Sequence, residues 1–278
     1  MAIASTKNDK IPQKLYTKEW GNDDYCIVFL HGLGGTSNYW LAGAKSIEYY
    51  FYNYPIMVVD LLGFGDSPKP WLKYNLDAHK TALESVTPKD KKLILVGHSL
   101  GALLALNFAK SHPQQVLGII ALSLPFFPSK NSAFEWLRLR PSGWIYTNMF
   151  FTALACLFTR RVVGKALPYF INSLPRKVVE DLVKHTVISS TSTIWSCIYD
   201  QDENKLLTKF PKNIPVELIH CKDDSTAPFK TVLPLASKFS HWRLHQLSQG
   251  GHHPWYSQHH ACINIIHSTI SRLTEQLT

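Results

Sequence analysis

Short apolar runs, many of them β-branched, recur along the chain and end in turn residues. They predict buried strands at 26–30, 56–59, 93–96, 117–121 and 216–220, and a further short strand from Leu244. Segments with helical spacing separate these runs, at 39–50, 76–86, 100–110 and about 258–277. This alternation predicts an α/β fold, in which a mostly parallel sheet carries helices on both faces.

The alternation stops after Pro125 and resumes at Pro215, with aromatic residues, prolines and helical spacing in between. Residues 1–125 and 211–278 are therefore expected to form the core, and residues 126–210 an inserted helical cap. Open α/β sheets bind ligands at the carboxyl ends of their strands, where an insertion can cover the site. The alternative is that this segment forms an independent helical module.

The composition is that of a globular protein with a net positive charge. The 278 residues are 45% hydrophobic and 18% charged, which excludes disorder as the main state. A formal net charge of +9 suits nucleic acid, an anionic membrane or an anionic substrate. Residues 126–210 hold 11 Lys or Arg against 6 Asp or Glu, so more than half of the excess lies there. Because no Lys/Arg run is interleaved with aromatics, nucleic acid is not an expected partner.

The chain carries no pattern typical of secretion or membrane insertion. Its five cysteines are odd in number and far apart, which indicates reduced thiols. The polar start of the sequence lacks the apolar run of a signal peptide, so a cytoplasmic location is expected. The longest apolar stretch, 144–158, is shorter than the roughly 20 residues that span a bilayer, and polar residues interrupt it.

The strongest chemical signal is the segment Gly97-His98-Ser99-Leu100-Gly101, which lies between a predicted strand and an apolar predicted helix. This G-x-S-x-G pattern, in a strand-turn-helix context, is typical of a nucleophilic serine. Such a turn strains the serine backbone, and glycines at both ends avoid collisions with the adjoining strand and helix. Ser99 would then lie beside a helix N-terminus, which favours a developing oxyanion.

With this turn, two further loops resemble the α/β-hydrolase family, specifically its cap-bearing branch. His31-Gly32-Leu33-Gly34-Gly35 is similar to the family's HG loop, and the segment from Asp60 to Ser67 is similar to its D-x-x-G-x-G-x-S loop. The resemblance covers about residues 24–125 and 210–276. It implies a serine hydrolase whose nucleophile, acid and histidine follow one another in chain order.

The resemblance also implies which residues complete a catalytic triad. The segment Gly250-Gly251-His252-His253-Pro254 is similar to the family's GH-x-P loop, which puts His252 at the base position and His253 one residue beyond it. The late acid loop selects Asp224, with Asp223 as the fallback, although Cys221 stands where the family usually has glycine. Asp60 and Asp66 are expected to brace their loop.

Further site residues follow from the same resemblance. The backbone amides of Leu33 and Leu100 are the implied oxyanion donors. The expected substrate contacts are Gly32, His98, Trp136, Trp144 and Phe151. The aromatic residues of the insertion could either pack the cap onto the sheet or line an apolar pocket.

No cofactor or metal is expected. The paired histidines His252-His253 and His259-His260 lack an accompanying metal motif, and His259 and His260 would begin an exposed helix. Gly63-Phe64-Gly65 lacks the remainder of a dinucleotide fingerprint. Arg160-Arg161, directly after an apolar stretch, is typical of an interfacial helix with a basic edge, so membrane contact through the cap is a hypothesis.

The sequence thus predicts hydrolysis of a carboxylic ester of a small apolar acyl or aromatic substrate, through an acyl-enzyme. A thioesterase, a carbon–carbon bond hydrolase or an acyltransferase would use the same three side chains. A non-catalytic ligand-binding receptor or scaffold on this fold is the alternative from another class. The oligomeric state is left open.

Overall fold

The computed structural model describes residues 14–139, 148–164, 166–201, 206–275 and 277. Its centre is a sheet of seven strands in the spatial order β1-β3-β2-β4-β5-β6-β7. The strands are β1 (Thr17–Trp20), β2 (Tyr25–Leu30), β3 (Ile56–Val59), β4 (Lys92–His98), β5 (Val116–Leu122), β6 (Val216–Cys221) and β7 (Trp242–Leu247). All neighbours pair in parallel except β1, which is antiparallel to β3. The five predicted buried strands and the short strand at Leu244 are confirmed.

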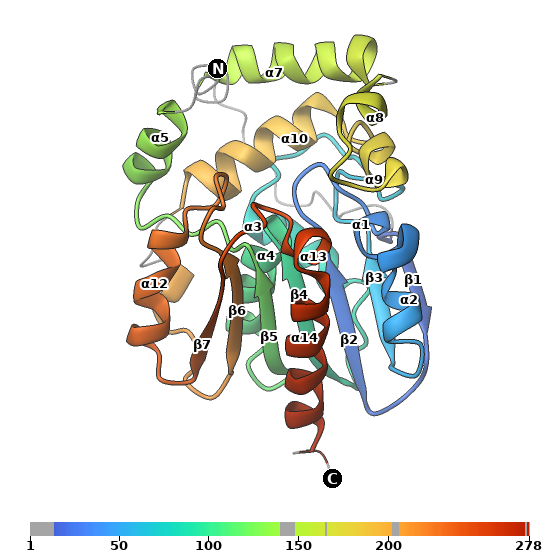
Figure 1. The fold of residues 1–278 in the computed structure, drawn as a ribbon, viewed down its shortest axis with the longest axis vertical. Helices are drawn as coiled ribbons and strands as arrows, with labels where there is room; N and C mark the ends of the chain where they lie inside the picture. The colour runs from blue at the N-terminus through green and yellow to red at the C-terminus, as the bar shows by residue number, and fades with distance from the viewer. Residues whose placement is uncertain (1–13, 140–147, 165, 202–205, 276, 278) are drawn as a thin grey trace.

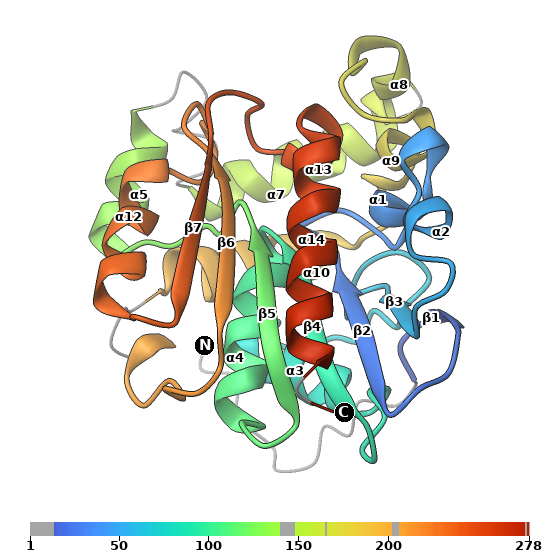
Figure 2. The same ribbon diagram turned by 60° about the horizontal axis from the view of Figure 1, so that its bottom comes forward.

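Helices cover both faces of the sheet, as predicted (Figures 1 and 2). The helices of the core are α1 (Asn38–Leu41), η1 (Gly43–Lys45), α2 (Ile47–Tyr50), α3 (Leu76–Glu84), α4 (Leu100–Ser111), α12 (Phe229–Lys238), α13 (Pro254–Ser257) and α14 (His259–Thr274). Alternate strand residues point to opposite faces, and each face is apolar. Leu95 of β4 packs with α3 and α4, whereas Ile94 and Val96 pack with α14. Such two-sided burial explains why these strands are continuous apolar runs.

The described residues between positions 126 and 210 form helices beyond the carboxyl ends of the strands, at the top of Figure 1. Within the described residues they are α5 (Lys130–Arg138), α7 (Met149–Phe158), η2 (Thr159–Val163), α8 (Leu167–Phe170), α9 (Arg176–Asp181), α10 (Val187–Thr193) and η3 (Ile194–Tyr199). This segment contacts the loop after β3 directly. The Gly65 amide donates to the Lys184 carbonyl (2.8 Å), and the Ser189 hydroxyl donates to the Gly63 carbonyl (2.8 Å).

Some predicted elements differ from the structure. The expected helix 39–50 is three short pieces, because Gly43 has a positive φ of +74° and Ser46 is extended. His259 is buried rather than exposed, because its ring packs against Trp255 and donates to the Trp255 carbonyl (2.9 Å). In the described part of the chain, no helix is long and apolar enough to cross a membrane.

Candidate active site

The turn between β4 and α4 holds Ser99 in a strained conformation. Its φ of +51° and ψ of −114° lie outside the regions that L residues favour. A Cβ at Gly97 would lie 2.4 Å from the Gly101 carbonyl, and one at Gly101 would lie 2.4 Å from the Leu30 carbonyl oxygen. Only glycine fits at either position, so the predicted role of the two glycines is confirmed. Ser99 therefore directly precedes the first turn of α4.

A hydrogen-bonded chain of side chains starts at Ser99. The Ser99 hydroxyl lies 3.0 Å from Nε2 of His252. Nδ1 of His252 donates to the Asp224 carboxylate, at 2.9 Å from Oδ2 and 3.1 Å from Oδ1. Because Nδ1 carries the proton toward Asp224, Nε2 is free to accept the Ser99 proton. The structure thus brings Ser99 together with His252, 153 positions later in the chain, and with Asp224, which precedes His252 by 28 positions.

The surroundings of Asp224 keep its carboxylate ionised. Burial alone would raise the pKa of Asp224, but the hydrogen bond from His252 and the Ala227 amide outweigh burial and lower that pKa below its usual value. The Thr226 and Ala227 amides both donate to Oδ1 at 2.9 Å. Nε2 of His220 lies 3.5 Å from Oδ2 and donates to the Ala227 carbonyl (2.9 Å), and burial lowers the pKa of His220. The sequence reasoning missed His220.

The two adjacent carboxylates have different contacts. Asp223 accepts from the Gly251 amide (2.9 Å) and the Gly250 amide (3.1 Å), which belong to the loop before His252. These amides lower the pKa of Asp223. Asp223 therefore holds the histidine loop, and Asp224 contacts the histidine ring. The choice of Asp224 over Asp223 agrees with this geometry.

His98, expected to contact substrate, instead holds the backbone of the histidine loop. Its Nε2 donates to the His252 carbonyl (2.7 Å), and its ring stacks on Tyr39 with centroids 4.4 Å apart. Burial, reinforced by His252 and His253, lowers the pKa of His98 well below its usual value. A buried, neutral ring with this hydrogen bond fits a positioning residue better than a substrate contact.

The HG loop lies directly against the nucleophile. A Cβ at Gly32 would lie 2.8 Å from Nδ1 of His98 and 3.2 Å from Cβ of Ser99. Leu33 follows in this loop, and Leu100 is the first residue of α4. Within the described residues, neither the Leu33 amide nor the Leu100 amide donates a hydrogen bond. Two free amides beside a serine at a helix N-terminus can stabilise negative charge on a carbonyl oxygen.

Asp60 and His31 join the loops that follow β2 and β3. Nε2 of His31 accepts from the Leu61 amide (2.9 Å), and burial lowers the pKa of His31. The buried Asp60 carboxylate accepts from the Ser37 amide (2.6 Å) and the Asp66 amide (2.8 Å). Asp60 therefore braces its loop, as expected.

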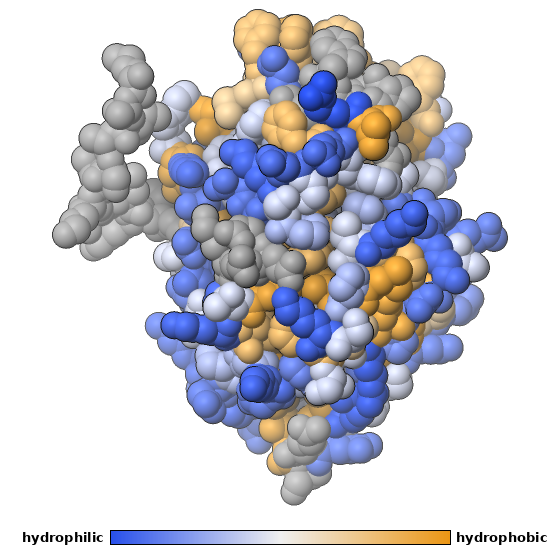
Figure 3. Space-filling model, turned by 90° about the vertical axis from the view of Figure 1, so that its left-hand side faces the viewer, coloured by the Kyte–Doolittle hydropathy of each residue, from blue (hydrophilic) through white to orange (hydrophobic). Residues whose placement is uncertain are grey.

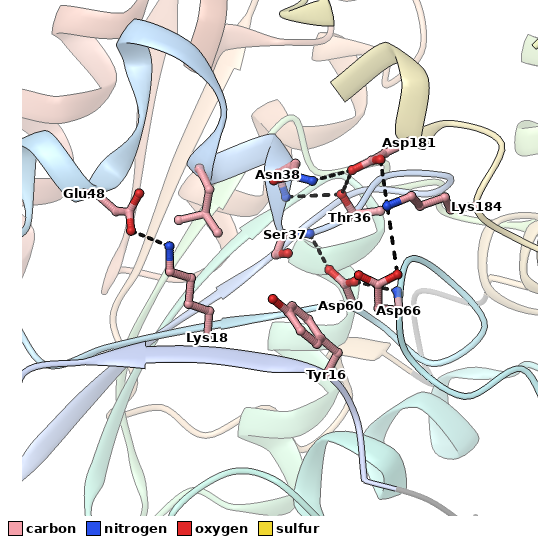
Figure 4. Close-up of a pocket in the computed structure, with 11 residues that line it drawn as sticks. Tyr16, Lys18, Thr36, Ser37, Asn38, Glu48, Asp60, Asp66, Asp181 and Lys184 are labelled. Atoms are coloured by element: carbon pink, nitrogen blue, oxygen red, sulfur yellow. Dashed lines mark hydrogen bonds and ion pairs between the residues drawn. The ribbon is translucent and has the colours of Figure 1, made fainter. Parts of the chain in front are cut away.

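The sequence reasoning also missed Asp181, a buried carboxylate that comes from the inserted segment. Its Oδ2 accepts from the Thr36 hydroxyl (2.7 Å) and from the side-chain Nδ2 of Asn38 (2.5 Å), two residues that follow the HG loop (Figure 4). Lys184 lies 3.0 Å from the other oxygen and links onward to Asp66. A polar cavity of about 220 Å³ opens here, and Ser99 does not line it. Asp181 and Thr36 are 145 positions apart, and no pattern in the sequence connects them. The sequence therefore carried no signal for this hydrogen bond.

The expected aromatic contacts of the insertion occupy different environments. Trp136 packs on the small cluster of Phe127, Ala133 and Tyr199. Phe151 is exposed on α7. Trp144 lies outside the described residues. Among the described residues, no group of three or more His, Cys, Asp or Glu side chains could hold a metal ion.

Two curated relatives align with parts of the chain. A probable lysophospholipase of Arabidopsis thaliana, BODYGUARD 4, is 34% identical over 109 residues, which are 37% of this chain and 25% of that protein. The abhydrolase domain-containing protein abhd-5.2 of Caenorhabditis elegans is 25% identical over 253 residues, which are 82% of this chain and 55% of that protein. The chain thus matches between a quarter and about half of the length of these relatives.

Similarity to solved structures and to a family sequence model extends over most of the chain. An esterase from Exiguobacterium antarcticum shares the fold, with a TM-score of 0.72 and 16% identity over 92% of this chain and 95% of that one. The sequence model described as "Alpha/beta hydrolase family" matches residues 27–265. The chain therefore belongs to the alpha/beta hydrolase family.

Proposed function

We propose that this chain is a serine hydrolase that cleaves a carboxylic ester of an apolar acyl or aromatic substrate. The observation that carries the proposal is the continuous chain of hydrogen bonds from Ser99 through His252 to Asp224. A serine hydroxyl is a weak nucleophile unless a base accepts its proton, and the base needs a carboxylate to orient its ring. All three groups are present with distances that suit proton transfer.

In the proposed reaction, Nε2 of His252 accepts the Ser99 proton as Oγ attacks the ester carbonyl. Asp224 stabilises the resulting imidazolium, and the Leu33 and Leu100 amides stabilise the oxyanion. The tetrahedral intermediate collapses, the imidazolium gives its proton to the leaving alcohol, and the acyl group stays on Ser99. Water then attacks the acyl-enzyme with His252 again as base, which releases the acid and restores Ser99.

Several observations favour this chemistry over the alternatives. A serine at position 99 disfavours mechanisms that form an ester on an aspartate nucleophile. A ligand-binding receptor would need neither the strained Ser99 backbone nor the ionised Asp224. An esterase and a probable lysophospholipase are among the similar proteins, and both names refer to ester cleavage. Thioester cleavage, carbon–carbon bond hydrolysis and acyl transfer would use the same side chains.

We also propose that residues 126–210 act as a cap that selects the substrate, with Trp136, Trp144 and Phe151 as candidate contacts. Support comes from the contacts of this segment with loops next to the nucleophile. Asp181 of α9 bonds Thr36 and Asn38 just after the HG loop. Movement of the segment would therefore change both access to the site and the loop that carries Leu33.

Activity of the purified protein on p-nitrophenyl esters of increasing acyl length tests this function. The wild type is expected to show a chain-length optimum. His252→Gln is expected to lose about 10⁴-fold in kcat/KM. The matched variant His253→Gln should keep most activity, because His253 bonds neither Ser99 nor Asp224 in the described residues. Equal activity of wild type and His252→Gln would contradict the proposal.

A further inference from the structure

The inserted segment exposes an apolar face on its outermost helices. We call this surface the α7–α8 face and define it by its exposed large side chains, which are Met149, Phe150, Phe151, Leu154, Leu157, Phe158, Val162, Tyr169 and Phe170. Their exposed fractions range from 38% to 78%. Figure 1 shows α7 as the element farthest from the sheet, and Figure 3 shows hydrophobic side chains gathered at that end of the molecule. An apolar patch of this extent marks an interaction surface.

Helix α7 is amphipathic in the reverse sense to a helix of a globular core. Phe150, Leu154 and Phe158 follow one another at steps of four and point to solvent. The inner face carries Thr152, which is buried, and Cys156, whose sulfur lies 3.2 Å from Nε2 of His185 and 3.3 Å from the Ser190 hydroxyl. The polar contacts thus hold α7 onto α10, whereas Phe150, Leu154 and Phe158 on its other side are exposed.

The stretch of sequence that includes α7 and α8 is basic, although Arg176 near its end is paired with Glu180 (2.9 Å). Residues 136–179 contain seven Lys or Arg and no Asp or Glu. Arg160 and Arg161 are exposed directly after α7, and no ion pair joins either of them to a carboxylate in the described part of the chain. A second copy of this chain would bring two basic surfaces together, which disfavours self-association through the α7–α8 face.

We propose that the α7–α8 face binds the surface of an anionic lipid bilayer, with α7 lying in the interface and its phenylalanines inserted among the acyl chains. Apolar side chains with flanking arginines provide both contributions to interfacial binding, apolar burial and attraction to anionic headgroups. The short length of these helices fits a helix that lies on the bilayer rather than one that crosses it. This inference rests on the exposed face and does not depend on the chemistry of Ser99.

The test is flotation of the purified full chain with vesicles of phosphatidylcholine alone or mixed with phosphatidylserine. The wild type is expected to float with the mixed vesicles at low salt, and added salt should weaken binding because the electrostatic part is screened. Phe150→Ser/Phe158→Ser and Arg160→Glu/Arg161→Glu should each weaken vesicle binding about tenfold or more.

Two matched variants control for general changes in apolarity and charge. Tyr49→Ser/Trp71→Ser removes two aromatic residues that are as exposed but lie outside the α7–α8 face. Lys89→Glu/Lys212→Glu reverses two exposed charges that precede β4 and β6, at the opposite end of the sheet. Both are expected to bind vesicles like the wild type, and thermal unfolding checks that every variant folds.

Three outcomes would overturn the proposal. The wild type could fail to float with anionic vesicles at low salt. The control variants could lose as much binding as the variants of the α7–α8 face. Light scattering could instead show a dimer that Phe150→Ser/Phe158→Ser makes monomeric, in which case a second copy covers the face. Esterase activity is measured on the same protein samples. If activity is retained while vesicle binding is absent, the lipid proposal fails and the proposed function does not.

Discussion

The sheet and the inserted segment use apolar residues in opposite ways. In β4, Leu93 to Val96 are fully buried, and the strand exposes only its first residue, Lys92. In α7, Phe150 is 70% exposed and Phe158 is 56% exposed, whereas the polar Thr152 is buried. Apolar character alone therefore does not say where a residue lies. The sheet buries its apolar side chains, which stabilises the fold, whereas α7 exposes them, as an interaction surface would.

The largest effect is expected at the adjacent carboxylates of the core. Asp224→Asn should lower kcat about 10⁴-fold, because the amide cannot stabilise the charged His252 ring and favours the wrong tautomer. Asp223→Asn should cost less than about tenfold, since its amide oxygen can still accept from the Gly250 and Gly251 amides. Steady-state hydrolysis of a p-nitrophenyl ester measures both. Similar losses in the two variants would contradict the separate roles of these carboxylates.

Truncations in the two regions should differ in their effect on stability. Leu95→Ala removes a fully buried side chain and should lower the free energy of unfolding by about 2–5 kcal/mol. Phe150→Ala should change it by less than about 0.5 kcal/mol, since the side chain is exposed. Urea unfolding measures both values. A large loss in Phe150→Ala would mean that the α7–α8 face is covered in solution.

Acid should destabilise the folded chain through two buried histidines where the core meets the segment. Nε2 of His79 in α3 lies 3.2 Å from the Thr193 hydroxyl, and the ring of His185 lies 6.2 Å from that of Phe64. Burial lowers the pKa of His79 to about 3 and that of His185 to about 4. The unfolded chain takes up these protons near pH 6.5, before the folded state does, so stability is highest above pH 6.5 and falls as the pH drops toward 4. Each ring should contribute roughly 3 kcal/mol to this loss. Urea unfolding across this range measures it.

The variant His185→Gln sharpens the pH prediction, because it removes one of these buried rings without adding a charge. Its free energy of unfolding should depend less steeply on pH between 6.5 and 4 than that of the wild type. An unchanged dependence would show that protonation of His185 does not oppose folding.

The smallest effect is expected where the segment meets the HG loop. Asp181→Ala removes the acceptor of Thr36 and Asn38 and should lower kcat about tenfold with little change in KM, because the loop that carries Leu33 loses its anchor. Asp181→Asn should recover part of the rate. The neighbouring Glu180→Ala, which loses only an exposed pair with Arg176, should leave kcat unchanged. An equal loss in Glu180→Ala would contradict the positioning role of Asp181.

Local patterns made the core and its turn predictable. Gly97, Ser99 and Gly101 lie within five residues, so one short segment of sequence is enough to predict the strained turn. Buried strands were recognisable because both of their faces are apolar. The antiparallel strand β1 has exposed residues and no apolar run, so nothing in its pattern distinguished it from a loop.

Contacts between distant parts of the chain could not be predicted. The bond between Asp181 and Thr36 depends on how the segment packs over the sheet. The outward direction of Phe150 and Phe158 was also hidden, because a nearly uninterrupted apolar run has no polar stripe to orient it. The role of His98 could not be predicted either, because it depends on how the loop that carries His252 packs against the turn that carries Ser99.

The central claim, that Ser99 is an activated nucleophile, is tested most directly by reaction with a fluorophosphonate followed by intact mass and peptide mapping. We expect one adduct per chain, located on Ser99, with none in Ser99→Ala and much slower labelling in His252→Gln. Absence of labelling in folded wild-type protein, or labelling that persists in Ser99→Ala, would contradict it.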